Sequence, residues 1–436
     1  MIQTIDLRGR RPSSTELRAL VHRAEVDVSA AVPVAAEIIR DVRERGADAL
    51  AEQGDRFDGG RAAAIRVDPA TITAAVAKLP RQIRAALDEV IGRERAASRA
   101  QVPAPAVTTL APGATIAQRW QPVDRVGLYV PGGKAVYPSS VVMNVVPAQV
   151  AGVGSIALAS PPQTAFDHEV HPLILGVAGV LGVDEVYAMG GAGAIGALAY
   201  GVPSLSLEPV DVVAGPGNVY VAAAKRVVQG DVGIDAEAGP SEVLVIADAG
   251  ADPVVVAADL ISQAEHDESA AAVLVTVSPE LADAVRAELE RQVAQTSARE
   301  RVLVALAGPQ SAIVLVDDLD TAARVSDAYA PEHLEIQTAD PGAILDRVSH
   351  AGAIFLGTHS PVSLGDYLAG SNHILPTGGT ARFTSGISAV TFLRPQQVVQ
   401  YDAAALRQVA PHIRAMSDAE QLPAHGDAVD ARFRGR

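Results

Sequence analysis

The sequence contains no cysteine, few aromatic residues and fewer basic than acidic side chains. The absence of cysteine excludes disulfides, thiolate nucleophiles, iron–sulfur clusters and cysteine-bound zinc, so a bound metal would need histidine, carboxylate or amide ligands. With 35 Lys and Arg against 51 Asp and Glu, the net charge is −16. This charge argues against nucleic acid as a partner, because nucleic-acid affinity depends on neutralising phosphates.

Aromatic residues make up only 3% of the 436 residues, although 49% are hydrophobic. A core of Ala, Val, Leu and Ile suits helices packed on β-branched strands, so we expect an α/β fold. Two long uncharged stretches, 135–166 and 188–207, are interrupted by Pro and Gly, which favours buried segments over membrane spans. Because the first ten residues are charged and lack an apolar run, we expect no secretory signal and a cytoplasmic location.

Strand-like and helical segments alternate along most of the chain. The predicted strands are 125–130, 155–159, 185–189, 242–246, 272–277, 312–316, 334–337 and 353–356, and the predicted helices between them are 169–181, 220–228, 253–266, 279–295 and 321–329. This alternation predicts parallel sheets with crossover helices. Residues 29–100 have a helical, charged pattern, and after 379 only one helix and a polar tail are expected.

Two glycine-rich segments are candidates for cofactor binding. Gly191–Gly196 matches the G-x-G-x-x-G pattern of dinucleotide-binding proteins, between a predicted strand and a predicted helix. A chance match in an Ala- and Gly-rich chain explains this pattern equally well. The turn Gly215–Asn218 could present backbone N–H groups to an anion, or it could be an ordinary tight turn.

The adjacent Glu332 and His333 are the strongest acid–base candidates. Consecutive residues of an extended strand point to opposite sides, so both can reach one site only where the backbone turns. The alternative is a surface glutamate beside a core histidine, since paired titratable residues are common outside active sites.

Other polar residues fit a metal or ligand site. Gln263 and His266 are three residues apart on a predicted helix, where they are either ligands or part of a solvated face. Asp366 and His373 fall in a predicted Gly- and Asn-rich loop after a strand, where α/β proteins bind ligands. Taken alone, His425 has the pattern of an exposed histidine in the tail.

Together these segments resemble the histidinol dehydrogenase family, from about Ser29 to Val429. The resemblance rests on eight blocks in the same order: Leu128–Gly133, Tyr137–Ser140, Ala214–Asn218, Ala238–Leu244, Ser262–His266, Ala330–Leu334, Gly365–Tyr367 with Ser371–Thr377, and Ala424–His425. It implies oxidation of L-histidinol to L-histidine through histidinaldehyde, with two successive hydride transfers to NAD.

The resemblance also implies a role for each matching residue. His333 is implied as the base that takes the hydroxyl proton, and Glu332 as the residue that activates water. One zinc ion per subunit, which orients the substrate, is implied to be held by Gln263, His266, Asp366 and His425. The implied substrate contacts are these four ligands together with Ser241, His333, His373 and Glu420.

The implied NAD contacts are Tyr129 and Asn218. At Gly193 the family commonly has a Gln that contacts NAD, so this chain lacks one contact and cofactor affinity is the property affected. The same glycine creates the apparent G-x-G-x-x-G, which we therefore interpret as coincidental. NAD is expected to bind through Tyr129, Asn218 and backbone groups.

The implied architecture is two Rossmann-like parallel-sheet domains of similar fold. Residues 1–125 are expected to form a helical region packing on the second α/β domain, 126–238 the first domain on the NAD side, and 239–377 the second domain with the metal and catalytic residues. The tail, 378–436, is expected to cross to a partner subunit in a homodimer with shared active sites. No nucleic-acid or membrane partner is expected.

Two rival interpretations remain. A related zinc-dependent dehydrogenase could act on another small alcohol, although the presence of Glu332, His333 and Glu420 favours histidinol. A non-catalytic small-molecule-binding protein would also have two α/β lobes. That interpretation expects an export signal and gives no role to Glu332 and His333.

Overall fold

The computed structural model describes residues 2–23, 28–132, 136–237 and 239–434. Gly133 and Ala238, which belong to two of the motifs above, lie outside the described residues, and Ala238 also marks a predicted domain boundary. The chain divides into two compact units. The first comprises Met1–Gln101 and Val123–Phe392, and the second comprises Val102–Pro122 and Leu393–Arg436.

The first unit contains two parallel sheets with the same strand order. Within the described residues, one sheet has the order β6-β5-β4-β7-β8 and the other the order β1-β11-β10-β9-β12-β13. When the strands of each domain are numbered along the chain, starting from β4 and from β9, both sheets have the strand order 3-2-1-4-5. In the second sheet, β1 is an additional edge strand. The prediction of two Rossmann-like domains of similar fold is therefore confirmed.

The strands lie close to the predicted segments. The first sheet consists of β4 (Arg125–Tyr129), β5 (Ser155–Ser160), β6 (Val186–Ala188), β7 (Val212–Ala214) and β8 (Gly233–Ile234); the second consists of β1 (Gln3–Asp6), β9 (Glu242–Ala247), β10 (Ala271–Thr276), β11 (Ala312–Leu315), β12 (His333–Gln337) and β13 (Ala353–Leu356). Every residue of β9 and β10 is buried, as expected for parallel strands covered by helices on both faces.

Crossover helices cover both sheets. They are α6 (Pro138–Ala151), α7 (Pro172–Val180), α8 (Gly191–Tyr200) and α9 (Val219–Val228) in the first domain, and α10 (Pro253–Ala264), α11 (Pro279–Val293), α12 (Arg299–Ala307), α13 (Leu319–Tyr329), α14 (Pro341–Leu345) and α15 (Val362–Tyr367) in the second. Asp252 shows how such a helix starts, because its carboxylate accepts from the Val254 N–H and Pro253 occupies the first helical position. Among the described residues, no helix is long and apolar enough to cross a membrane.

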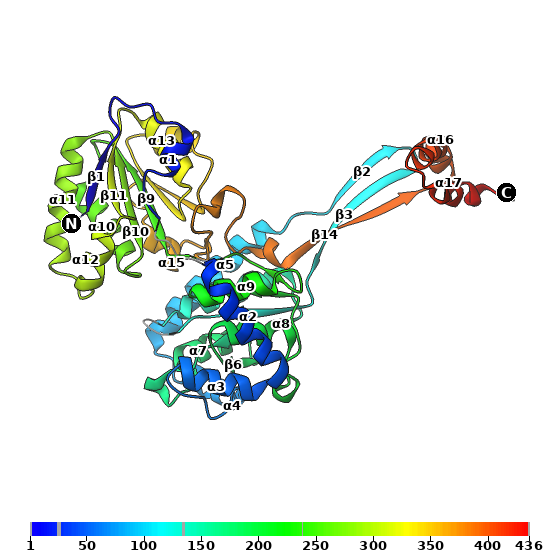
Figure 1. Cartoon of the computed structure of the whole chain (residues 1–436), viewed down its shortest axis with the longest axis horizontal. Coiled ribbons are helices and arrows are strands. Elements are labelled where there is room, and N and C mark those ends of the chain that lie inside the picture. The colour runs from blue at the N-terminus through cyan, green and yellow to red at the C-terminus, as the bar shows by residue number, and fades with distance from the viewer. Residues whose placement is uncertain (1, 24–27, 133–135, 238, 435–436) are drawn as a thin grey trace. The chain divides into compact units, whose positions relative to one another are not determined.

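The N-terminal helices pack on the first α/β domain, so the prediction that they pack on the second is wrong. Helix α2 (Val28–Arg45) contacts α8 and α9, α4 (Pro69–Ala77) contacts α7, and α5 (Arg81–Gln101) contacts α6. Figure 1 shows α2, α3 (Ala47–Phe57) and α4 beside this domain. The reason is the small-residue surface of α8, where a Cβ on Gly196 would lie only 3.1 Å from Ile39. Strand β1 and α1 (Ser14–Arg18) pack on the second domain instead.

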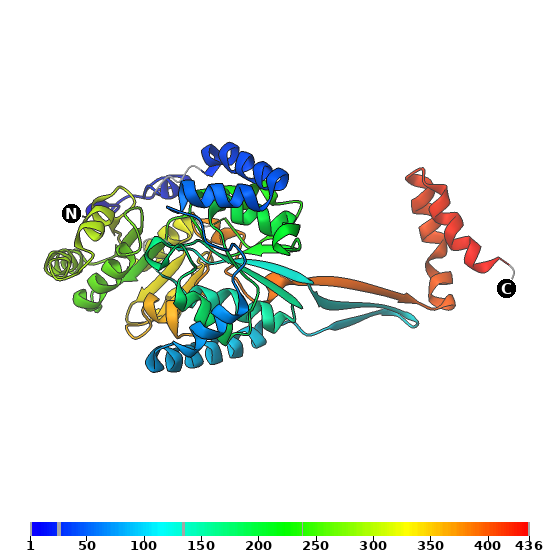
Figure 2. The same cartoon turned by 90° about the horizontal axis from the view of Figure 1, so that it is seen from below.

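The second unit is an antiparallel sheet followed by two helices. Strand β3 (Ala114–Pro122) pairs with both β2 (Ala106–Ala111) and β14 (Leu393–Tyr401). Helices α16 (Ala403–Ala419) and α17 (Pro423–Asp430) pack on each other and are drawn in red in Figure 2. The prediction of one helix and a polar tail is therefore wrong. The sequence of β14 is mostly polar and exposed, so it carries no strand-like apolar pattern.

Candidate active site

Glu332 and His333 lie together at the start of β12. The left-handed backbone of Ala330, at φ 50°, ends α13 and turns the chain just before the pair. Glu332 is 6% exposed and His333 is 3% exposed, and the Glu332 Oε2 atom is 3.4 Å from the His333 Nδ1 atom. Both side chains are therefore buried at the same site. The alternative interpretation, in which Glu332 lies on the surface, is wrong.

The carboxylate of Glu332 is held by two hydrogen bonds. Its Oε2 atom accepts from the Ser241 hydroxyl at 2.7 Å and from the Glu242 N–H at 2.8 Å. Burial raises the pKa of Glu332 to about 7, because desolvation disfavours the charged form more than these bonds stabilise it. A carboxylate with this pKa can gain or lose a proton near neutral pH.

The His333 imidazole is oriented by the backbone. Its Nδ1 atom is 2.9 Å from the Glu242 carbonyl oxygen, which can only accept, so Nδ1 carries the proton in the neutral ring. The Nε2 atom is then left with a lone pair. Burial lowers the pKa of His333, which favours the neutral imidazole. His333 is therefore suited to accept a proton at Nε2.

His373 joins the two domains of the first unit. Its Nδ1 atom donates to the Asp366 carbonyl at 2.9 Å, and its Nε2 atom lies 3.1 Å from the hydroxyl of Ser140 on α6. Burial lowers the pKa of His373, so the neutral ring accepts from that hydroxyl. Sequence reasoning noted the motif at 137–140 but assigned Ser140 no role, because the contact joins residues 233 positions apart.

Three candidate metal ligands belong to the same domain. Gln263 is 2% exposed, and among the described residues neither its amide oxygen nor its amide nitrogen has a hydrogen-bond partner. Helix α10 ends at Ala264, so His266 follows the helix and is not on its face as predicted. Asp366 lies in α15 and not in a loop. In the described part of the chain, no three His, Cys, Asp or Glu side chains gather closely enough to hold a metal ion.

These residues lie at the amino-terminal edge of the second sheet. Ser241 precedes β9 and His333 begins β12, and α10 returns from the carboxyl end of β9 to bring Gln263 to the same edge. Ligands of open α/β sheets usually bind at the carboxyl edge. The catalytic candidates therefore use the opposite edge from the one that strand-order rules indicate.

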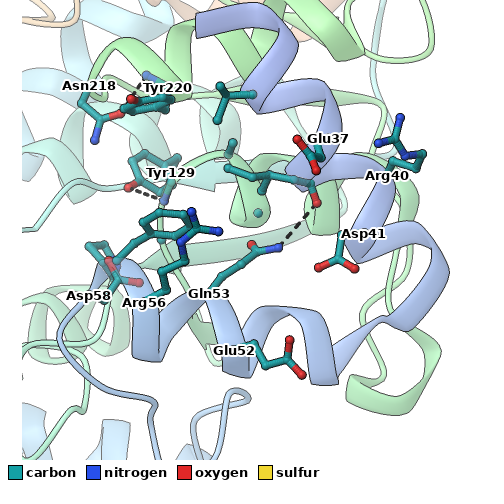
Figure 3. Close-up of a pocket in the computed structure, with 18 of the residues that line it drawn as sticks. Glu37, Arg40, Asp41, Glu52, Gln53, Arg56, Asp58, Tyr129, Asn218 and Tyr220 are labelled. Carbon is teal, nitrogen blue, oxygen red and sulfur yellow. Dashed lines mark hydrogen bonds between the residues drawn. The ribbon is translucent and has the colours of Figure 1, made fainter.

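A pocket of about 990 Å³ lies at the carboxyl edge of the first sheet. Tyr129, Gly193 and Asn218 all line it. Figure 3 shows Tyr129 and Asn218 on one side of this pocket. The Tyr129 hydroxyl accepts from the Gly191 N–H at 3.2 Å, and burial raises the pKa of Tyr129 to about 12. Asn218 caps α9 by accepting from the Tyr220 N–H at 3.0 Å, so its side chain is fixed at the wall of the pocket.

The same pocket has a wall that sequence reasoning missed. Gln53 and Asp58 come from α3 and the residue after it, and Glu37 and Asp41 come from α2. Burial raises the pKa of Asp58 to about 6. The sequence around these residues does not indicate a binding site, because they precede the first strand of the sheet by 67 or more positions. Packing of α2 and α3 on the first domain brings them to the pocket.

Glu420 and His425 belong to the second unit. Glu420 is the residue after α16 and His425 lies in α17, and both are exposed. They line one hollow together with Met416. The first unit thus holds Ser241, Gln263, His266, Glu332, His333, Asp366 and His373, whereas the second unit brings Glu420 and His425 together.

Known proteins resemble this chain over its whole length. The family model described as histidinol dehydrogenase matches residues 21–433. The chain is 66% identical to histidinol dehydrogenase from Leifsonia xyli, over 100% of both chains, and 57% identical to that of Mycobacterium tuberculosis, over 99% of this chain and 98% of the relative. The crystal structure of histidinol dehydrogenase from Elizabethkingia anophelis matches with a TM-score of 0.92 and 33% identity, over 99% of this chain and 98% of that one. The chain therefore belongs to the histidinol dehydrogenase family of oxidoreductases.

Proposed function

We propose that this chain oxidises L-histidinol to L-histidine at the edge of the second sheet, with Glu332 and His333 as its catalytic residues. The observation that carries the proposal is the buried pair itself, with its side chains 3.4 Å apart and both pKa values shifted by burial. Each conversion consumes one water and two NAD, and it yields two NADH and three protons including the one lost from the acid. NAD, when bound, accepts the hydride of each step.

His333 acts in the oxidation of the alcohol. The neutral imidazole takes the hydroxyl proton of histidinol at Nε2, while the carbon gives up its hydride and becomes the aldehyde. The hydrogen bond from Nδ1 to the Glu242 carbonyl keeps the ring in the tautomer that can accept this proton. The same bond stabilises the imidazolium that forms.

Glu332 acts in the oxidation of the aldehyde. Its carboxylate takes a proton from water, and the hydroxide adds to the aldehyde carbon to give the hydrate. Loss of the second hydride from that carbon then gives the acid. Ser241 and the Glu242 N–H both bind Oε2, so the Oε1 atom is the one left to face water.

The residues present fit a zinc ion. A buried amide without hydrogen-bond partners costs about 1–3 kcal/mol per unsatisfied group, and a metal at the Gln263 oxygen would remove part of that cost. Gln263, His266 and Asp366 would hold the ion with His425 of a second subunit, an N/O ligand set consistent with zinc. The ion would bind and orient the imidazole and amine of the substrate.

The residues that would bind NAD line the pocket of the first domain. Tyr129, Asn218 and the backbone around Gly193 are the proposed contacts, and Ser140 and His373 connect this domain to the catalytic edge. Because a Cβ on Gly132 would lie 2.8 Å from Pro161, the absence of a side chain allows these two lining residues to pack closely.

We further propose a homodimer in which Glu420 and His425 complete the site of the neighbouring chain. Both side chains are exposed and line the same hollow of the second unit, so packing within that unit does not account for them. A cytoplasmic location is proposed as well, because the reaction consumes NAD and makes an amino acid for the cell's own use.

The proposal is tested by following NADH formation after L-histidinol is added to the purified chain. Activity should disappear when a chelator removes the metal and return when zinc is added back. No turnover by the zinc-loaded protein would contradict the assignment, and turnover of another small alcohol in place of histidinol would support the rival dehydrogenase.

A further inference from the structure

We propose that Gln53 is an NAD-binding residue, and that Gly193 is the residue that makes room for its amide. This inference rests on the proposed placement of NAD in the pocket lined by Tyr129 and Asn218. It assigns the pocket a contact from α3, an element outside the α/β domain.

The first argument is space. A Cβ built on Gly193 would overlap the Oε1 atom of Gln53, and it would also lie 3.3 Å from Leu50. The Gln53 amide thus occupies the volume into which any side chain at position 193 would project. Helices α3 and α8 contact each other, so the amide reaches the pocket from the neighbouring helix. Figure 3 shows Gln53 extending among the labelled pocket residues.

The second argument is hydrogen-bonding capacity. The Gln53 Nε2 atom donates to the Ile38 carbonyl at 3.5 Å, the outer limit of a hydrogen bond. It also interacts with the carboxylate of Asp41, whose pKa is lowered mainly by Arg45. Within the described residues, no group donates a hydrogen bond to the Gln53 Oε1 atom. The amide therefore has an acceptor for a hydroxyl or amino group.

The third argument is charge. Among the described residues, the charged groups on this wall are five carboxylates and two guanidinium groups: Glu37, Asp41, Glu44, Glu52, Asp58, Arg40 and Arg56. Gln53 is the uncharged side-chain amide on the α2–α3 wall. A neutral amide can both donate to and accept from the ribose hydroxyls or the amino and amide groups of NAD, and it adds no repulsion of the diphosphate.

The test is a double-mutant cycle on the zinc-loaded full-length chain. NADH binding is measured by its fluorescence and by calorimetry without histidinol, for the variants Gln53→Ala, Gly193→Ala and both together. Gln53→Ala should weaken binding about three- to tenfold, as expected for one neutral hydrogen bond. Gly193→Ala should weaken it similarly by displacing the amide, and it should have no further effect when Gln53 is already Ala.

Matched controls separate this effect from general damage. Gln292→Ala removes a partly exposed glutamine from α11, and Gly92→Ala adds a methyl group in α5 where nothing lies within 4 Å. Both should bind NADH as the unchanged chain does. Unchanged binding in Gln53→Ala, or equal losses from Gly193→Ala in both backgrounds, would overturn the proposal.

Asn218→Ala distinguishes a failure of this inference from a failure of the pocket assignment. If Asn218→Ala weakens NADH binding and Gln53→Ala does not, only the role of Gln53 is wrong. If neither variant changes binding, the cofactor binds elsewhere, and both the pocket assignment and the inference are overturned.

Discussion

In the proposed mechanism Glu332 and His333 act in different steps, and burial shifts their pKa values in opposite directions. Burial raises the pKa of the carboxyl group to about 7 and lowers that of the imidazole. The carboxylate is fixed by Ser241, and the imidazole is fixed by the Glu242 carbonyl. Two different bases are therefore available at one buried place.

Substitutions at these two residues should affect different steps. Glu332→Gln keeps the size of the side chain but cannot take a proton from water, so the aldehyde should accumulate after a first hydride transfer. His333→Ala should slow alcohol oxidation itself, by about 10²- to 10⁴-fold for the loss of a general base. Rapid-mixing measurements of NADH with a carbonyl trap distinguish the steps, and equal loss in both steps for both variants would contradict this division.

The aldehyde step should depend on pH through Glu332. Its pKa of about 7 means that the carboxylate gains a proton as the pH falls through that value, and the protonated form cannot act as a base. The rate with histidinaldehyde as substrate should therefore decrease about tenfold for each pH unit well below 7. A rate that is flat from about pH 6 to about pH 8 would argue against Glu332 as the base.

At the scale of residues, the sequence predicted which side chains could act as bases or ligands. It did not predict their contacts with residues far away in the chain. The adjacent Glu332 and His333 could be recognised because two titratable residues stand together. Ser140 and Gln53 could not, because each acts on a residue more than a hundred positions away. Such contacts depend on how helices pack, which leaves no local pattern.

At the scale of elements, a pair of carboxyl groups joins the three elements that carry the site: buried Glu335 and partly buried Asp259. Glu335 on β12 accepts from the Val362 N–H at the start of α15, and it hydrogen-bonds Asp259 on α10. Gln337 donates to both carboxyl groups. Burial, followed by the Asp259 charge, raises the pKa of Glu335 to about 8. The pair therefore holds a proton at neutral pH and ties together the elements bearing Gln263, His333 and Asp366.

The substitution Glu335→Gln should change the pH dependence of stability. Because the folded-state pKa exceeds the ordinary value of 4.5, the contribution of Glu335 is full below that value and is lost as the pH rises toward 8. Between about pH 5.5 and about pH 7.5, the free energy of unfolding of the unchanged chain should decrease as the pH rises. Its slope should be more negative than that of Glu335→Gln by about 1.4 kcal/mol per pH unit. Denaturant unfolding at several pH values measures this difference, and parallel curves would contradict it.

Most elements were predictable, and the failures have a common cause. Buried parallel strands such as β9 are continuous apolar runs, and capped helices such as α10 begin at Asp-Pro. Strands β2 and β14 are largely exposed and β3 is mostly half-buried, so they have no apolar periodicity. The pairing of β3 with β14 joins segments about 280 residues apart, as Arg119 and Gln396 illustrate.

At the scale of the whole molecule, the proposed ligands are divided between two units. Gln263, His266 and Asp366 belong to the first unit and His425 to the second. Membership of an oxidoreductase family removes the non-catalytic binding protein as an interpretation. In the proposed homodimer, exposed Glu420 and His425 would be functional because they would complete the site of the neighbouring chain.

Complementation tests the shared site. Co-expression of a His425→Ala chain with a His333→Ala chain should restore activity, because the mixed dimer has one site with all its residues intact. Random pairing of subunits in a symmetric dimer should give about a quarter of full activity, since half the dimers are mixed and each has one working site. Each variant alone should be inactive, and a co-expressed pair without activity would mean that sites are not shared.

The central claim is that one site performs both oxidations of histidinol. The most direct measurement is the number of NADH molecules formed per L-histidinol consumed by the zinc-loaded chain under limiting substrate. We predict two NADH per histidinol, with L-histidine as the product and no free aldehyde released. A ratio of one, with aldehyde in solution, would contradict the claim.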